Sequence, residues 1–61
     1  MKKFLETYDK EDHVILINVD MIRYITVNDN KETVISMRGG SFFTVSETYR
    51  EIRDMLKNVN V

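Results

Sequence analysis

The stretch Ser41-Phe42-Phe43-Thr44-Val45-Ser46-Glu47 decides the fold, because the hydrophobic period of the chain changes inside it. Before Ser46, β-branched and aromatic residues come in short runs separated by polar clusters, a pattern typical of strands. After Ser46, apolar residues recur at spacings of three and four, which is typical of one face of a helix. These residues are Tyr49, Ile52, Leu56 and Val59. The chain therefore predicts a sheet followed by a C-terminal helix.

The residues around this boundary carry helix signals. Ser46 is a good helix N-cap, since its hydroxyl can accept a free backbone N–H of the first turn. Glu47 stands where the helix dipole favours negative charge. Arg50 and Asp54 are four residues apart and can pair on the outer helix face. We expect the helix to run to about Lys57, whose charge suits a C-terminal end.

Five runs before the helix are predicted to be strands, and their short connections favour antiparallel neighbours. Gly39 and Gly40 suit the positive φ angles of a tight hairpin, and the 28–30 cluster suits the same role less strongly. The segment 18–21 predicts a short helical turn capped by Asn18. The predicted strands are 4–8, 13–18, 23–27, 32–37 and 41–45. The expected fold class is α+β: an antiparallel β-meander of about five strands with one C-terminal helix packed on the sheet, in a single domain spanning 1–61.

A chain of 61 residues buries only about 60% of its unfolded surface, so its core is marginal. It has no Cys and a single His, His13. Disulfides, thiolate metal sites and histidine-rich metal sites are therefore excluded. Good packing or oligomerisation is left as the source of stability.

Charge and hydropathy restrict the possible partners. Nine basic residues balance ten acidic ones, for a net charge of -1, so there is no electrostatic reason to expect nucleic acid. No apolar stretch approaches the roughly 20 residues that span a bilayer. The N-terminal residues turn polar too early for a secretory signal. We expect a cytoplasmic protein that does not insert into membranes.

Strand alternation sorts the side chains of the last three strands into two faces. The parity expected to face the helix holds Ile25, Val27, Ile35, Met37, Phe43 and Val45. The opposite parity holds Tyr24, Thr26, Val34, Ser36, Phe42 and Thr44. The orientation of the first two strands stays open, because the second is apolar in both parities and the first offers Phe4 and Tyr8 opposite Leu5.

The face away from the helix is more apolar than a solvated sheet face normally is, and such patches mark interaction sites. The candidate protein interface consists of Phe4, Tyr8, Tyr24, Val34 and Phe42. We expect a homodimer formed either face to face through this surface or by pairing of edge strands. The alternative is that a twisted meander covers this face itself.

Candidate chemistry is sparse. Asp9, Glu11, Asp12 and His13 are the one cluster of plausible metal ligands, but charge at a hairpin tip is normally just solvated. A general base at His13 would need a partner in a cleft, and the serines have structural roles as strand, turn and cap residues. Gly39-Gly40 leads into a strand and not into a helix, which argues against a phosphate-binding loop. We expect no catalytic, metal or cofactor-binding residues.

From Ile17 to about Leu56 the order of features resembles the small flagellar protein family FlbD, also called SwrD. The matching features are Ile17-Asn18, Ile22 and Ile25, Thr33-Val34-Ile35, Gly39-Gly40, Val45 and Ser46-Glu47. This resemblance implies a bacterial cytoplasmic accessory protein that acts by contact, without catalytic residues.

The function expected from the sequence is therefore non-enzymatic protein binding by an accessory or regulatory module of bacterial or phage origin. One alternative is a phage-encoded inhibitor that binds and blocks a host protein involved in defence or metabolism. A further alternative is a sheet platform for nucleic acid, on which Tyr24, Phe42 and Phe43 would stack on bases. That alternative lacks the usual positive net charge.

Overall fold

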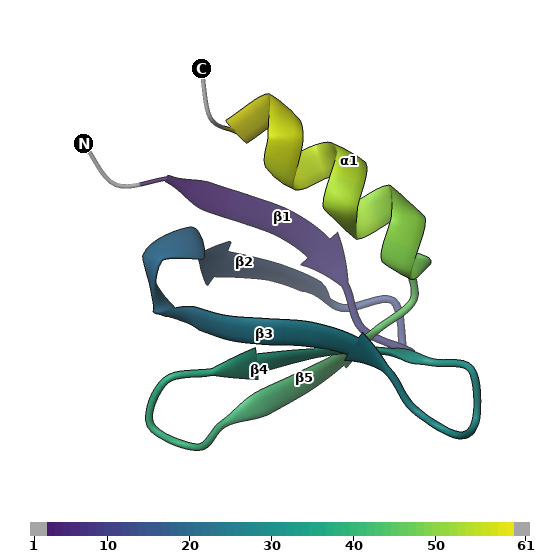
Figure 1. The fold of residues 1–61 in the computed structure, drawn as a ribbon. Helices are drawn as coiled ribbons and strands as arrows, with labels where there is room; N and C mark the ends of the chain where they lie inside the picture. The colour runs from purple at the N-terminus through teal and green to yellow at the C-terminus, as the bar shows by residue number, and fades with distance from the viewer. Residues whose placement is uncertain (1–2, 60–61) are drawn as a thin grey trace.

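The computed structural model describes residues 3–59 and has five antiparallel strands followed by one helix (Figure 1). The α+β fold class predicted from the sequence is confirmed, with strand ends within one residue of the expected ones. The elements in chain order are β1 (Phe4–Tyr8), β2 (Val14–Asn18), the 3₁₀ helix η1 (Val19–Met21), β3 (Ile22–Val27), β4 (Thr33–Met37), β5 (Phe42–Val45) and α1 (Tyr49–Val59).

The strands divide into two sheets, β1-β2 and β3-β4-β5. The break falls at η1, which is the short helical turn expected after Asn18. The Asn18 side chain accepts a hydrogen bond from the Asp20 N–H at 3.1 Å, so the predicted cap is confirmed. Val19 still donates to the Lys3 carbonyl of the first sheet, whereas the Met21 carbonyl already accepts from Arg38 of the second. The turn therefore moves the chain from one ladder to the other.

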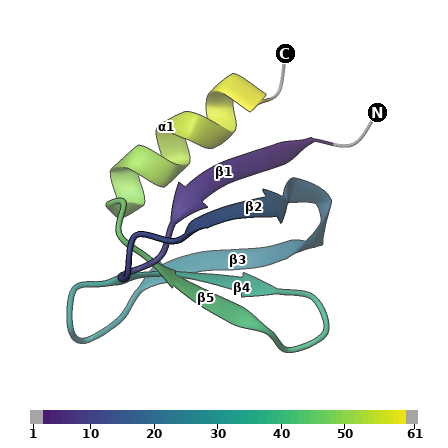
Figure 2. The same cartoon turned by 180° about the vertical axis from the view of Figure 1, so that it is seen from behind.

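The two sheets meet again at the end of β5. An isolated antiparallel bridge joins Asp9 to Val45, and the Ser46 N–H donates to the Tyr8 carbonyl at 2.8 Å. The β1-β2 hairpin is thereby tied to the segment that leads into α1. Two views from opposite sides show α1 lying alongside β1 (Figure 1 and Figure 2).

The core lies where both sheets and the helix converge. Its fully buried apolar residues are Leu5, Ile17, Ile35, Val45 and Ile52. Each sheet contributes the side chains of one parity, and the helix contributes the centre of its apolar stripe. Leu5 and Ile17 are a cross-strand pair of β1 and β2, which settles the parity that the sequence left open.

Two residues of the parity expected to face the helix share the face of the core residues but are not buried. Ile35 and Val45 are buried as predicted, and Ile25 and Met37 pack against the core. Val27 and Phe43, however, remain 46% and 36% exposed. Their exposure agrees with the position of the helix, because α1 makes its main contacts with β1 and β3.

The helix begins two to three residues later than expected, and its N-cap is not Ser46. The hydroxyl of Thr48 accepts a hydrogen bond from the Glu51 N–H at 3.1 Å, and the Glu51 carboxylate accepts one from the Thr48 N–H at 2.8 Å. This reciprocal pair is a capping box. The Ser46 hydroxyl instead donates to the Tyr8 carbonyl at 3.2 Å, because the strand bridge holds Ser46 against β1.

Other details of the helix also differ from expectation. It runs to Val59, beyond Lys57. The ion pair present on its described surface joins Arg53 to Asp54, at 3.9 Å, in place of the predicted pair of Arg50 with Asp54. Ile52 is buried, Leu56 is half-buried and Tyr49 is largely exposed, while the side chain of Val59 lies outside the described residues.

The hairpin turns follow the predicted chemistry with one change. Gly39 and Gly40 both have positive φ, 95° and 98°, as expected. In the turn after β3 the positive φ falls on Lys31, at 65°, and not on an Asn or Asp. Asn28 acts through its side chain, which accepts hydrogen bonds from the N–H groups of Asn30 and Glu32.

Candidate functional site

The outer face of the three-stranded sheet carries three of the five residues of the predicted interface. The strand register places Tyr24 opposite Ser36 and Ser36 opposite Phe42, forming one row across β3, β4 and β5. Val34 lies in the next row, between two threonines. Because Tyr24 and Phe42 are two strands apart, their backbones are roughly 10 Å apart. Two aromatic side chains therefore stand on either side of the central strand.

These residues line an open hollow of about 400 Å³. Tyr24 is 54% and Phe42 is 67% exposed, whereas Ser36 between them is buried. The residues that line the hollow are Arg23, Tyr24, Thr26, Asn28, Val34, Ser36, Gly40 and Phe42. The hollow thus combines exposed aromatic walls with hydroxyl, amide and guanidinium groups, a composition typical of protein-binding surfaces.

Arg23 stands over the Tyr24 ring, with its guanidinium carbon 5.8 Å from the ring centroid. This distance is within the range of a cation–π contact. It arises where the β3-β4 register shifts between Ile22 and Tyr24, a bulge that turns the strand locally. The positive charge therefore lies at the β3 side of the hollow.

Phe4 and Tyr8, the other two predicted interface residues, lie on a different sheet. They share the outer face of the β1-β2 hairpin with Val14 and Leu16, as the register shows. All four side chains are exposed. The five predicted residues thus form two surfaces, because η1 separates the strands that the sequence placed in one continuous meander. The exposure of Val14 and Leu16 was missed, since β2 is apolar in both parities.

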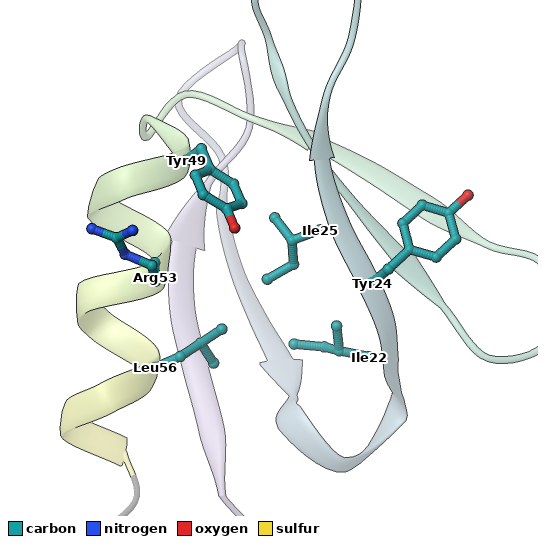
Figure 3. A pocket seen from close by; sticks show the side chains of 6 residues that line it. All are labelled: Ile22, Tyr24, Ile25, Tyr49, Arg53 and Leu56. Carbon is teal, nitrogen blue, oxygen red and sulfur yellow. The ribbon is translucent and has the colours of Figure 1, made fainter.

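A second cavity lies between α1 and β3 and was not anticipated from the sequence. It has a volume of about 260 Å³. Figure 3 shows Ile22 and Ile25 projecting from β3 toward the helix, with Tyr49 and Leu56 projecting toward β3. Tyr24 and Arg53 complete the lining. The spacing of Tyr49, Arg53 and Leu56 indicates that they lie on the same edge of the helix. No local sequence pattern shows which strand faces that edge.

The turn between β1 and β2 brings Asp9, Glu11 and His13 together, with candidate ligand atoms within 4.8 Å of one another. His13 Nδ1 is 3.3 Å from Asp9 Oδ2 and 3.8 Å from Glu11 Oε1. The other Asp9 oxygen accepts hydrogen bonds from the N–H groups of Glu11 and His13. The bond from the His13 backbone is the main cause that lowers the pKa of Asp9 below its ordinary value. This turn explains the cluster without an ion, so we assign no metal site to it.

Across residues 3–59, no helix is both long and apolar enough to cross a bilayer. Comparison of the chain with models of known protein families, with curated proteins and with solved structures finds no significant match. Function must therefore be argued from the surfaces described above.

Proposed function

We propose that the chain is a non-enzymatic protein-binding module, and that its main interface is the outer face of β3-β4-β5. The observation that carries this proposal is the exposed pair Tyr24 and Phe42, which flank the buried Ser36 in one cross-strand row. Aromatic residues are enriched at the centres of interfaces, because they bury a large area with little loss of side-chain freedom.

The charges around this face also favour binding to a protein. Arg23 is held at the β3 side against Tyr24, and arginine is enriched at interfaces together with tyrosine. The remaining polar groups of the hollow are neutral: Thr26, Asn28 and Ser36. Such groups form hydrogen bonds to a partner without a large desolvation cost.

The occupant we propose is a second copy of the chain, with the two sheet faces stacked as in a β-sandwich. A core of this size is rarely worth more than about 3–5 kcal/mol without disulfides or a metal. Burying a large apolar side chain completely contributes roughly 1.5–3 kcal/mol. Because Tyr24 and Phe42 are about half to two-thirds exposed, covering both in each protomer would add appreciably to a marginal stability.

Sedimentation of the wild-type chain and of Phe42→Glu tests this proposal. The wild-type chain is expected to dimerise at tens of micromolar, and Phe42→Glu is expected to be monomeric, with a melting temperature that no longer depends on concentration. Leu16→Glu, which places the same charge on the outer face of the other sheet, is the matched control and should remain dimeric. A monomeric, fully stable wild-type chain contradicts the homodimer and leaves an external protein as the occupant. A dimer lost in Leu16→Glu alone points to association through the outer face of β1-β2.

Two biological roles for such a module are expected from the sequence. An accessory or regulatory role like that of the FlbD family and a phage-encoded inhibitor of a host protein both act by contact, in the cytoplasm. Affinity purification with the wild-type chain and with Phe42→Glu separates them. If the chain is monomeric, a flagellar protein lost with Phe42→Glu supports the first role, and a host defence or metabolic protein lost in the same way supports the second.

A nucleic-acid platform is the second candidate, favoured by the Arg23–Tyr24 pair and by Phe42 on one sheet face. Aromatic side chains on a sheet can stack on unpaired bases. The net charge of -1 argues against it. Binding of single-stranded oligonucleotides that weakens steeply with salt would favour this candidate.

A further inference from the structure

The groove between α1 and β3 is a separate surface from the proposed sheet interface. Figure 3 shows that the Tyr24 ring points away from the helix, whereas Ile22 and Ile25 point toward it. The sheet hollow and this groove therefore open in different directions from β3, and Tyr24 is the one described residue that lines both. Phe42 and Val34 line the hollow alone, and Leu56 and Tyr49 line the groove alone, so the two surfaces can be tested separately.

The apolar walls of the groove are held in place by the core. Ile22, Ile25 and Leu56 are half-buried and pack against the buried core cluster. Tyr49, at 43% exposed, closes one end, with its ring directed across the groove (Figure 3). Because these side chains are supported from beneath, the groove exists before any ligand binds, which lowers the cost of binding. Its volume of about 260 Å³ suits an apolar side chain of a partner.

The helix edge that borders the groove is cationic. Successive helical residues are about 100° apart, so Arg53, Lys57 and Arg50 follow Tyr49 around the helix on the side away from the buried Ile52. All three are exposed. By the same count Asp54 falls about 40° beyond Arg50, and Glu51 falls on the side opposite Tyr49. This helix side thus carries three positive charges and the single carboxylate of Asp54, and Arg53 is the cation that lines the groove.

Arg53 is the residue that connects this cationic edge to the groove. It lines the cavity, and Figure 3 shows its guanidinium directed away from β3, over the helix surface. The guanidinium Nε is 3.9 Å from the Asp54 carboxylate, and both side chains are about half exposed. A pair of consecutive helical residues at this distance contributes little. The guanidinium is therefore available to a carboxylate of a bound partner, with which it can form a bidentate pair.

We propose that this groove binds a short acidic segment of a partner protein, which inserts one apolar side chain between Ile25 and Leu56 and directs carboxylates to Arg53 and its neighbours. The apolar cavity requires an aliphatic or aromatic group, and the cationic edge requires negative charge close to it. A segment that alternates such groups satisfies both, whereas free phosphate or nucleic-acid backbone leaves the cavity unfilled. Among the described residues, the lining of this site shares Tyr24 alone with the sheet interface, and the proposal does not require the homodimer.

Selection from a library of short random peptides, displayed against the immobilised full chain, tests the proposal. The selected peptides are expected to carry Leu, Ile, Phe or Met with Asp or Glu nearby. Synthetic copies are expected to perturb the backbone amide signals of α1 and β3 in NMR spectra. Arg53→Glu should weaken their binding by about tenfold or more, a change of about 1.4 kcal/mol, and should favour charge-reversed versions of the same peptides.

Exposed positions are used for the variants so that folding is preserved. Tyr49→Ala is expected to weaken binding because it opens one end of the groove, and Phe42→Glu is the control that should bind the peptides as the wild-type chain does. Loss of binding in Phe42→Glu would assign the peptides to the sheet face and overturn the proposal. It is equally overturned if no peptide is enriched, if the enriched peptides lack acidic residues, or if Arg53→Glu binds them unchanged. If the chain binds phosphatidylserine vesicles and no peptides, the proposal of a protein segment is wrong and a lipid surface is the ligand.

Discussion

The hydroxyl of Thr7 donates a hydrogen bond to the carboxylate of Glu47 across forty residues of sequence. The same carboxylate oxygen lies 3.3 Å from the Tyr8 backbone nitrogen, which also donates to it. Thr7 is fully buried on the inner face of β1. Glu47 therefore ties β1 to the segment that precedes α1, a role that differs from the helix-dipole role expected for it.

Replacement of Thr7 by Val removes this donor while keeping the shape of the side chain. We expect a loss of about 1–2 kcal/mol in the free energy of unfolding, because a partly buried carboxylate loses a hydrogen-bond partner. Urea unfolding measures the change. Thr26→Val, at an exposed strand position, is the matched control when both variants are measured as monomers, and should cost less than about 0.5 kcal/mol. Equal effects of the two substitutions would show that the Thr7–Glu47 bond contributes nothing specific.

The capping box predicts different effects for two neighbouring hydroxyl residues. Thr48→Ala should destabilise the protein by about 1 kcal/mol, since it leaves the Glu51 N–H without its acceptor. Ser46→Ala should cost less, because the Ser46 hydroxyl makes only an exposed hydrogen bond to a carbonyl. Thermal unfolding followed by circular dichroism at the helix band distinguishes the two. A larger effect of Ser46→Ala would show that Ser46 is the N-cap, as expected from the sequence.

Asp9 gives the protein a pH-dependent contribution to stability. Its pKa in the folded state is lowered, chiefly by the backbone hydrogen bond from His13. A group with a lowered pKa contributes stability that is present above its ordinary value and is lost as pH falls through the folded value. We therefore expect the urea concentration at the unfolding midpoint to decrease as the pH is lowered below about 4. The decrease should be less steep in Asp9→Asn than in the wild-type chain. Asp29→Asn, in the exposed turn after β3, is the control. An unchanged acid profile in Asp9→Asn would contradict this assignment.

The strand β2 carries no charged residue, and its second edge lies beside β3 without pairing to it (Figure 1 and Figure 2). We expect this edge to become available for aggregation when the two sheets separate on heating. Leu16, 62% exposed, stands at its centre. Leu16→Lys is expected to slow aggregation on heating, measured by light scattering, with a change in unfolding free energy below about 0.5 kcal/mol. Asn58→Lys adds the same charge to the exposed surface of α1 and serves as the control. If both variants slow aggregation equally, the effect comes from net charge and not from the edge.

Much of the local structure followed from neighbouring residues alone. The change of period near Ser46 predicted the strands and the helix, because alternation and helical spacing are properties of contiguous sequence. Asn18 capped the short helical turn, and Gly39 and Gly40 took the positive φ angles, because these roles depend on the residue and its immediate backbone. The sequence by itself thus determined the fold class and most element boundaries.

The tertiary structure alone decided where the sheet is divided and which surfaces remain open. Phe4 and Phe42 have the same outward parity, yet they lie on different sheets because η1 turns the chain between two ladders. The partner of Glu47 and the facing of Ile25 by Leu56 also depend on contacts between segments distant in sequence. Periodicity gives the direction of a side chain relative to its own element. The placement of that element against the others depends on how the whole core packs, which no single stretch of the sequence contains.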